Sequence, residues 1–327
     1  MTQAQETTQS TRWSPGALGW IAAGLAVLVV SQRWIQGLFQ TPAWQTGATV
    51  FVSIVVQALP FLGLGVLLSA TIAAYVPASF FAKALPSRPA LAVPVAGAAG
   101  VVLPGCECAS VPVAGGLMSR GVAPAAALAF LLSSPAINPV VIVSTFVAFP
   151  NEPLMAVARF GASLVVAVVM GWAWMRFGRD EWLRIPSRSH LEGATRFETF
   201  RRTASHDFLH AGGFLVIGAL AAAVLNVLVP TQWLDSLAAR PALSVLALAA
   251  LAVVLCVCSE ADAFVAASLT QFSLTAGLAF LVVGPMVDLK LFALQAGMFG
   301  RSFAVRFAPA TFVVAVSVAS LVGWWLW

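Results

Sequence analysis

The sequence predicts an all-α polytopic membrane protein with two inverted structural repeats and an extra N-terminal helix. Each repeat is expected to hold a re-entrant or broken C-x-C hairpin and a Pro-broken helix. Sixty per cent of the 327 residues are hydrophobic and only 9% are charged. Several apolar runs reach the roughly 20 residues that a helix needs to cross about 30 Å of hydrocarbon. In addition, the second half of the chain repeats features of the first half, which indicates duplicated units.

The composition excludes several classes of protein. It rules out two soluble domains, which the length alone would allow. The net charge of +5 is interpreted as membrane topology, so the lipid bilayer is the expected partner and nucleic acid is not. Residues 1–15 lack the basic start of a signal peptide, so the first apolar run is predicted to stay as a helix. No Walker motif is present, and no cofactor is predicted.

The repeat is clearest around the cysteines. The pair Cys256/Cys258 follows the pair Cys106/Cys108 at an offset of 150 residues (256 − 106), and the protein has no other cysteine. The same offset aligns 128–131 with 278–281, Pro135 with Pro285, and Asn138 with Asp288. Two aligned pairs that hold all the thiols of the chain predict that the repeat is built around a site.

The first part of the chain follows from its helix breakers. The N-terminal tail and the first helix, about Gly16–Ser31, occupy 1–46. Repeat 1 (47–177) is predicted to contain, in order, a long helix over Gly47–Val76, an interfacial stretch over 78–89, two breaker-rich elements over 90–119 and 122–149, and a helix over Pro153–Phe177. The element over 122–149 is expected to break between Ser133 and Pro139.

The second part repeats this order. A basic loop without hydrophobic period, 178–205, separates the two repeats. Repeat 2 (206–327) is predicted to contain a helix over 208–229, an interfacial piece over Thr231–Arg240, the second C-x-C element over 241–269, a helix over 274–299 broken near Gly284-Pro285, and a last helix from about Phe303.

The distribution of Lys and Arg favours re-entrant C-x-C elements. With both elements re-entrant and loop 178–205 in the cytoplasm, nearly all basic residues outside the membrane lie on the cytoplasmic side, and only Arg33 and Arg240 lie opposite. Each repeat then has three true spans, and this odd number inverts one repeat relative to the other. We therefore expect a multi-pass protein of the plasma (inner) membrane with both C-x-C bends near the bilayer centre.

The paired cysteines predict a site for a soft ion. In an extended backbone residues i and i+2 point the same way, so two sulfurs could hold one ion. Thiolates select soft metals, and trivalent arsenic shares this preference. The metal-binding residues are thus predicted to be Cys106, Cys108, Cys256 and Cys258. Two alternatives remain: the cysteines pack as small apolar residues, or they form a redox pair.

Charged residues within apolar segments add a second set of candidates, because such residues usually mark a substrate or proton path. Glu107, Glu260 and Asp262 are predicted to couple protons, since a carboxylate beside a thiol can take the proton that the thiol loses on binding. Asn138 and Asp288, at matching helix breaks, are predicted to bind substrate. The structural alternatives are that Asp288 and Lys290 neutralise each other, and that Arg159 and Arg306 extend to opposite interfaces.

Three stretches resemble the predicted-permease family that includes the ArsP proteins. They are L-P-G-C-E-C-A-S-V-P-V-A-G-G-L (103–117), A-L-A-F-L-L-S-S-P-A-I-N-P (127–139) and the weaker C-x-C-S-E-A-D-A-F (256–264). The resemblance covers about 47 to 320. It implies transport, described in that family as efflux of trivalent organoarsenicals, and a thiol-dependent site that maps onto Cys106, Glu107, Cys108 and Asn138.

The sequence therefore predicts a secondary transporter, not an enzyme. It would move a trivalent arsenical or a thiophilic metal ion outward with proton coupling. One alternative is a membrane thiol-disulfide oxidoreductase that uses the paired C-x-C motifs. The other is a permease for an anion or an organic solute, with structural cysteines and a path along Arg159, Lys290 and Arg306.

Overall fold

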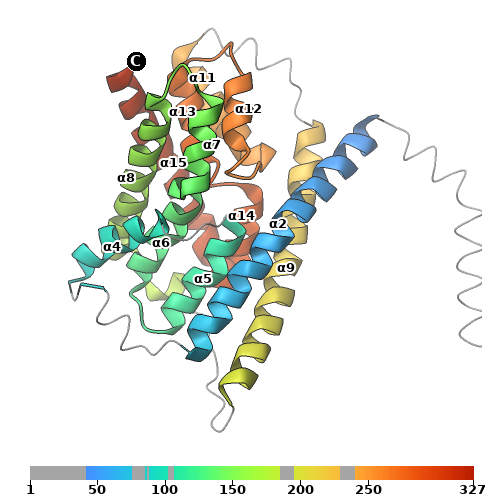
Figure 1. Ribbon diagram of the computed structural model, residues 1–327, viewed down its shortest axis with the longest axis vertical. Coiled ribbons are helices and arrows are strands. Elements are labelled where there is room, and N and C mark those ends of the chain that lie inside the picture. The colour runs from blue at the N-terminus through green and yellow to red at the C-terminus, as the bar shows by residue number, and fades with distance from the viewer. Residues whose placement is uncertain (1–41, 76–84, 87, 102–106, 185–194, 229–239) are drawn as a thin grey trace, which may run out of the picture. The chain divides into compact units, whose positions relative to one another are not determined.

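The computed structural model describes residues 42–75, 85–86, 88–101, 107–184, 195–228 and 240–327 (Figure 1). Gly47–Trp327 form one compact unit, and Met1–Thr46 form a separate one. The predicted first helix, the interfacial stretch before Leu85, most of Thr231–Arg240 and the residue Cys106 lie outside the described residues.

Every regular element in the described residues is a helix, as expected for this class. The first half contains α2 (Pro42–Tyr75), α4 (Pro89–Ala98), η1 (Ala99–Val101), α5 (Glu107–Ser119), α6 (Pro124–Ile137), α7 (Pro139–Ala148) and α8 (Leu154–Phe177). After η2 (Asp180–Trp182), the second half contains α9 (Arg196–Leu228), α11 (Pro241–Leu255), α12 (Asp262–Ser268), α13 (Leu274–Val283), α14 (Leu289–Phe299) and α15 (Arg301–Leu326).

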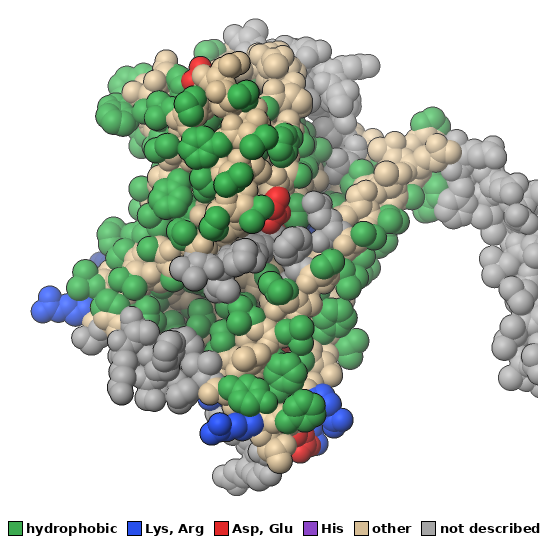
Figure 2. All heavy atoms as spheres, in the orientation of Figure 1, with side chains coloured by type: hydrophobic (Ala, Val, Ile, Leu, Met, Phe, Trp, Pro, Cys, Tyr) green, Lys and Arg blue, Asp and Glu red, His purple; other side chains and the backbone are tan. Residues whose placement is uncertain are grey.

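Five segments of the described chain are long and apolar enough to cross a membrane. They are Pro42–Ile72, Pro124–Ala148 (α6 with α7), Leu154–Phe177, Arg196–Val224 and Arg301–Leu326. Large apolar side chains are exposed along these helices, for example Val56 and Leu67 on α2 and Val313 and Leu321 on α15. Figure 2 shows a face on which hydrophobic side chains predominate and charged ones are few. Such a surface is suited to lipid, so the protein is a multi-pass membrane protein.

Two buried helices form the centre of the core. Every residue of α6 from Ala125 to Ile137 is buried, and so is every residue of α13 from Ala276 to Val283. The first packs against α4, α5 and α8, and the second against α11, α12 and α15. The two halves thus have the same order of elements and similar neighbours around their central helices. The inversion of one half relative to the other stays a prediction.

The helix breaks occur where the sequence predicts them. The first lies between α6 and α7 at Asn138, and the second lies between α13 and α14 over 284–288. Asn138 Oδ1 accepts a hydrogen bond from the backbone N–H of Val141 (3.0 Å), and Asp288 Oδ1 accepts one from that of Leu291. Both residues are N-caps, because their side chains satisfy an N–H group that the new helix leaves unpaired. Equivalent positions in the two halves therefore do the same structural work.

One expectation about the linker is wrong. Residues 196–205 were expected in a loop, but they form the first ten residues of α9. The Thr195 hydroxyl accepts a hydrogen bond from the backbone N–H of Glu198 (3.2 Å), and Glu198 forms an i,i+4 ion pair with Arg202 (2.7 Å). A cap and a pair of this spacing support a helix without an apolar stripe, which a search for hydrophobic period does not detect.

Candidate functional site

The two C-x-C motifs have different local structures. In the first, Glu107 and Cys108 are the opening residues of α5, and both side chains are fully buried. In the second, α11 ends at Leu255, and Cys256 has a left-handed backbone with φ 50° and ψ 37°. Cys256 is the sole non-glycine residue with positive φ in the described chain. Such a conformation costs roughly 1–2 kcal/mol outside glycine, and strained residues of this kind cluster at functional sites.

The left-handed turn sends the two sulfurs of the second motif to different places. Cys256 packs in a small cluster with Ile54, Ala219 and Ala222, and its sulfur interacts with the backbone at the start of α14. Cys258 belongs to the large core cluster, which also contains Cys108. The expected extended geometry, with both sulfurs of one motif pointing the same way, is therefore wrong for Cys256/Cys258. Instead, one thiol from each motif lies in the shared core.

Lys290 joins the first motif to the second half of the chain. It lies on the first turn of α14 and is 1% exposed. Its Nζ forms an ion pair with Glu107 Oε1 and lies 3.7 Å from Asp288 Oδ2. The thiols of Cys108 and Cys258 are also close enough to interact electrostatically with it. The interpretation that Lys290 only neutralises Asp288 is therefore incomplete, because Glu107 is its nearer partner.

Arg159 joins the second motif to the first half. This α8 residue is fully buried, and its guanidinium binds both carboxylate oxygens of Asp262 on α12, at 2.9 Å and 2.7 Å. It also donates to the Thr145 hydroxyl on α7 (2.9 Å) and to the carbonyl oxygen of Ser259 (3.3 Å). The interpretation that Arg159 extends to an interface is thus wrong. Arg306, in contrast, is exposed, and its guanidinium lies 4.9 Å from the ring centroid of Trp182.

The charged groups of the site form one electrostatic network with an excess of acids. Asp262 interacts with both Glu107 and Glu260, and Glu260 also interacts with Lys290. Together with Asp288, four carboxyl groups face the two cations Arg159 and Lys290, so the site would carry a charge of −2 (2 − 4) if all were ionised. A buried excess of negative charge is costly. The site is therefore suited to protons or to a cation, and poorly suited to an anion.

Several buried polar atoms of this network have unused hydrogen-bonding capacity. Within the described residues, no polar partner reaches Oε2 of Glu107 or the hydroxyl oxygen of Ser259, and Oε1 of Glu107 and Oδ2 of Asp288 have only the ammonium of Lys290 beside them. Buried polar atoms are normally satisfied, so such a group of exceptions indicates room for water or a ligand. No set of three or more His, Cys, Asp or Glu side chains in the described chain is arranged to hold a metal ion.

The structure thus brings together most of the predicted site residues that it describes. The network around Lys290 and Arg159 contains two of the predicted thiols and four of the predicted acids: Cys108, Cys258, Glu107, Glu260, Asp262 and Asp288. Cys256 lies beside it at the start of α14, Asn138 caps α7, and Cys106 is outside the described residues. Sequence reasoning missed Thr145 and the Ser259 carbonyl as partners of Arg159. The signal available in the sequence was an arginine within an apolar segment, since an intramembrane cation requires a partner.

Comparison with known proteins gives one family. Residues 43–324 match the family described as "Predicted permease". The UPF0718 protein YcgR of Bacillus subtilis is 35% identical over 278 residues, which cover 83% of this chain and 94% of the relative. A Streptococcus mutans protein named "Putative two-component membrane permease complex subunit" is 30% identical over 283 residues, or 84% of this chain and 94% of the relative. No solved structure matches the chain significantly.

Proposed function

The chain belongs to the predicted-permease family that includes ArsP and is a membrane permease, and we propose that its solute is soft and thiol-reactive. A trivalent arsenical or a thiophilic metal ion fits this description. The single observation that carries the proposal is the position of Lys290, which has the thiols of both Cys108 and Cys258 within electrostatic reach. Both cysteines are buried within the protein rather than turned to lipid, so one solute could contact a sulfur from each half.

The proposed binding set is Cys108 and Cys258, completed by Cys106 and Cys256 as the two halves move. Soft ions favour thiolate ligands. A transporter must also release its solute, and four thiolates on one ion would hold it too tightly. Two or three sulfurs engaged at a time satisfy both needs. Asp288 and Asn138, at the starts of α14 and α7, would line the site where helix ends face the solute.

Proton coupling is proposed through the carboxyl groups of the network. A thiol must lose its proton to bind a soft ion. Asp262 is paired with Arg159, and Glu107 is paired with Lys290. Glu260 is half-buried and is hydrogen-bonded to the thiol of Cys258. We assign Glu260 as the group that takes the proton of Cys258, and Glu107 as its counterpart beside Cys108. Proton uptake on one side and release on the other would drive efflux.

The test is flux through the purified protein in liposomes and through the protein in cells. A trivalent phenylarsenical and Zn²⁺ are the probes. Cys108→Ser and Cys258→Ser are each expected to lower the flux of the accepted probe at least about tenfold, since each removes a soft ligand. Ser268→Ala is the control, because Ser268 is an exposed residue of α12 whose hydroxyl binds only the local Val265 carbonyl among its described contacts. Unchanged flux in both cysteine variants, at normal protein levels, would refute the thiol site.

A second arm tests proton coupling. An imposed pH gradient should accelerate flux in the unmodified protein. Glu260→Gln should remove this acceleration, because a side-chain amide, unlike a carboxylate, does not take up a proton. Persistence of the full pH effect in Glu260→Gln would exclude Glu260 as the coupling group.

The Streptococcus mutans relative is named as a complex subunit. Comparing liposomes with cells therefore also shows whether this chain transports alone.

A further inference from the structure

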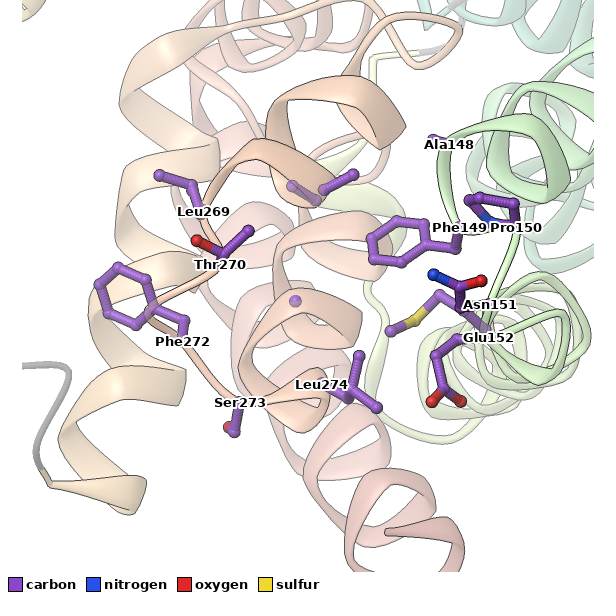
Figure 3. Close-up of a pocket in the computed structure, with 14 residues that line it drawn as sticks. Ala148, Phe149, Pro150, Asn151, Glu152, Leu269, Thr270, Phe272, Ser273 and Leu274 are labelled. Carbon is purple, nitrogen blue, oxygen red and sulfur yellow. The ribbon is translucent and has the colours of Figure 1, made fainter.

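A cavity of about 290 Å³ lies outside the charged network. It opens between the loop that follows α7 and the loop that follows α12, so each half of the chain contributes one wall (Figure 3). In Figure 3, Phe149, Pro150, Asn151 and Glu152 lie on one side, and Leu269, Thr270 and Phe272 lie on the other. The proposed binding site does not use this cavity.

The buried Arg159–Asp262 pair lies about one helical turn from residues that line the cavity. Met155 lines the cavity and precedes Arg159 by four residues on α8. Ala266 lines it and follows Asp262 by four residues on α12. Ala148 lines it and follows Thr145 by three residues at the end of α7. Three or four residues are about one turn of an α-helix, roughly 5–6 Å. Arg159 and the two side chains that bind its guanidinium, those of Thr145 and Asp262, therefore each lie about one turn along their helix from a residue that lines the cavity.

A thiol and two further acids adjoin the same pair. The carbonyl oxygen of Cys258 accepts hydrogen bonds from the backbone N–H groups of Ala261 (2.8 Å) and Asp262 (3.0 Å). Cys258 is thus one tight turn below the Asp262 end of the pair. Asp262 also interacts electrostatically with Glu107 and Glu260, which belong to the network. Along this segment, Asp262 thus lies between Cys258 and Ala266, which lines the cavity.

The geometry points to a role for both features: the cavity is an outer solute-binding mouth, and the Arg159–Asp262 pair is the gate that closes it from the thiol site. A gate across two halves must break when they separate, and Arg159 on α8 of the first half is bonded to the segment Ser259–Asp262 of the second. Thr145 on α7 holds the guanidinium from the first half. The pair is bidentate and fully buried, so it would block both solute and water while it is formed. This inference rests on the proposed transport function.

The lining of the mouth indicates the class of solute it admits. Glu152 is the one charged side chain among the described residues that line it; the rings of Phe149 and Phe272 and the thioether of Met155 contribute to the rest of the lining. A carboxylate with aromatic and thioether surfaces suits a small solute that has an apolar part and is neutral or singly positive. Anionic solutes would be repelled. The solute class agrees with the acidic balance of the inner network.

The side of the membrane follows from α8. Its N-terminal end, at Leu154, adjoins the cavity, and its C-terminal end, at Phe177, leads to the basic segment that begins at 178. Because α8 is long and apolar enough to span the bilayer, the cavity and this basic segment face opposite sides. With a cytoplasmic basic segment, the mouth opens outward and serves as the exit for efflux.

The gate is tested by cysteine labelling, which requires no transported solute and so fails independently of the proposed function. One chain keeps only Cys258, with Cys106, Cys108 and Cys256 changed to Ser. A second chain lacks all four cysteines and carries Thr270→Cys, an exposed position in the mouth. Each is reconstituted and treated from either side with a methanethiosulfonate that bears a trimethylammonium or a sulfonate group.

The cysteine of Thr270→Cys should react rapidly from the side opposite the basic segment. It should react several-fold faster with the cationic reagent than with the anionic one, and Glu152→Gln should abolish this preference. Cys258 should react slowly from the same side. Neutralising the gate with Arg159→Gln and Asp262→Asn together should raise the Cys258 rate at least about tenfold and leave the Thr270→Cys rate unchanged.

A Cys258 rate that is unchanged in the folded, neutralised protein would overturn the gate. A Cys258 rate as fast as that of Thr270→Cys in the intact protein would do the same. If the double variant fails to fold, Thr145→Val decides, because it removes one anchor of the guanidinium and keeps the ion pair. This change should raise the Cys258 rate by a smaller factor, and no increase would reject the gate. Labelling of Thr270→Cys that ignores reagent charge would reject the role of Glu152.

Discussion

Gly218 allows α9 to approach the first turn of α14, and an alanine at this position should disturb the site. A Cβ at Gly218 would lie 2.7 Å from Cα of Lys290, 3.1 Å from Cβ of Ala293 and 3.2 Å from the carbonyl oxygen of Leu289. Carbon atoms pack best at about 3.5–4.0 Å, so the two helices would have to separate by roughly 0.8 Å or more. The nearest atom belongs to the backbone and cannot rotate away.

Two opposing terms set the size of the effect. Overpacking of this kind costs about 1–3 kcal/mol, whereas replacing glycine by alanine within a helix contributes up to about 1 kcal/mol in favour of folding. We expect Gly218→Ala to lower the free energy of unfolding by up to about 2 kcal/mol, or several degrees in Tm at roughly 2–4 °C per kcal/mol. Flux should fall as well, because Lys290 would shift away from Glu107.

Gly213→Ala is the matched control on the same helix. Gly213 is exposed, and a Cβ there meets nothing within 4 Å, so this variant should unfold at the same temperature as the unmodified protein or slightly above it. Thermal unfolding in detergent can be followed by tryptophan fluorescence, since the chain has 11 tryptophans. If Gly218→Ala is as stable and as active as Gly213→Ala, the close approach of α9 and α14 has no importance for the site.

Two further predictions concern the charged groups. Lys290→Met leaves Glu107 and Asp288 without their cation and should lower the free energy of unfolding by about 3–5 kcal/mol, as removal of one partner of a buried ion pair does. Adding Glu107→Gln should restore a large part of this loss of stability. Strictly additive losses in this double-mutant cycle would show that the two side chains do not interact. Arg306→Gln should change the free energy of unfolding by less than about 1 kcal/mol, since the guanidinium is exposed over Trp182, and should leave flux unchanged. Loss of flux in this variant would favour the anion permease instead.

The positions of the helices and of their breaks could be predicted from local sequence. Asn138 and Asp288 act on N–H groups only three residues away. Proline alone does not mark the breaks, since Pro60, Pro135 and Pro309 lie inside α2, α6 and α15. The α8 helix was predicted from Pro153 to Phe177 and is found from Leu154 to Phe177. The start of α9 was missed because its support comes from a cap and an ion pair instead of an apolar stripe.

The site was only partly predictable. The candidates Cys108, Glu107, Glu260 and Asp262 follow from the rarity of thiols and acids in an apolar chain. Their partners do not follow, because a charge does not indicate in the sequence which opposite charge it will meet. Arg159 and Asp262 are 103 residues apart, and each could have paired with several other groups. The left-handed turn at Cys256 was equally hidden, since cysteine rarely adopts it.

The sequence by itself determined that this protein is a helical membrane protein with two similar halves, because composition, apolar length and breaker residues act locally and do not depend on how the helices are arranged. Transport followed from the resemblance of its motifs to a permease family. Only the tertiary structure decided that each half supplies the counter-charge for the other: Lys290 forms an ion pair with Glu107, and Arg159 forms one with Asp262. The physical reason is that a buried charge is tolerated only beside its partner. The packing of the helices determines which groups come within that distance.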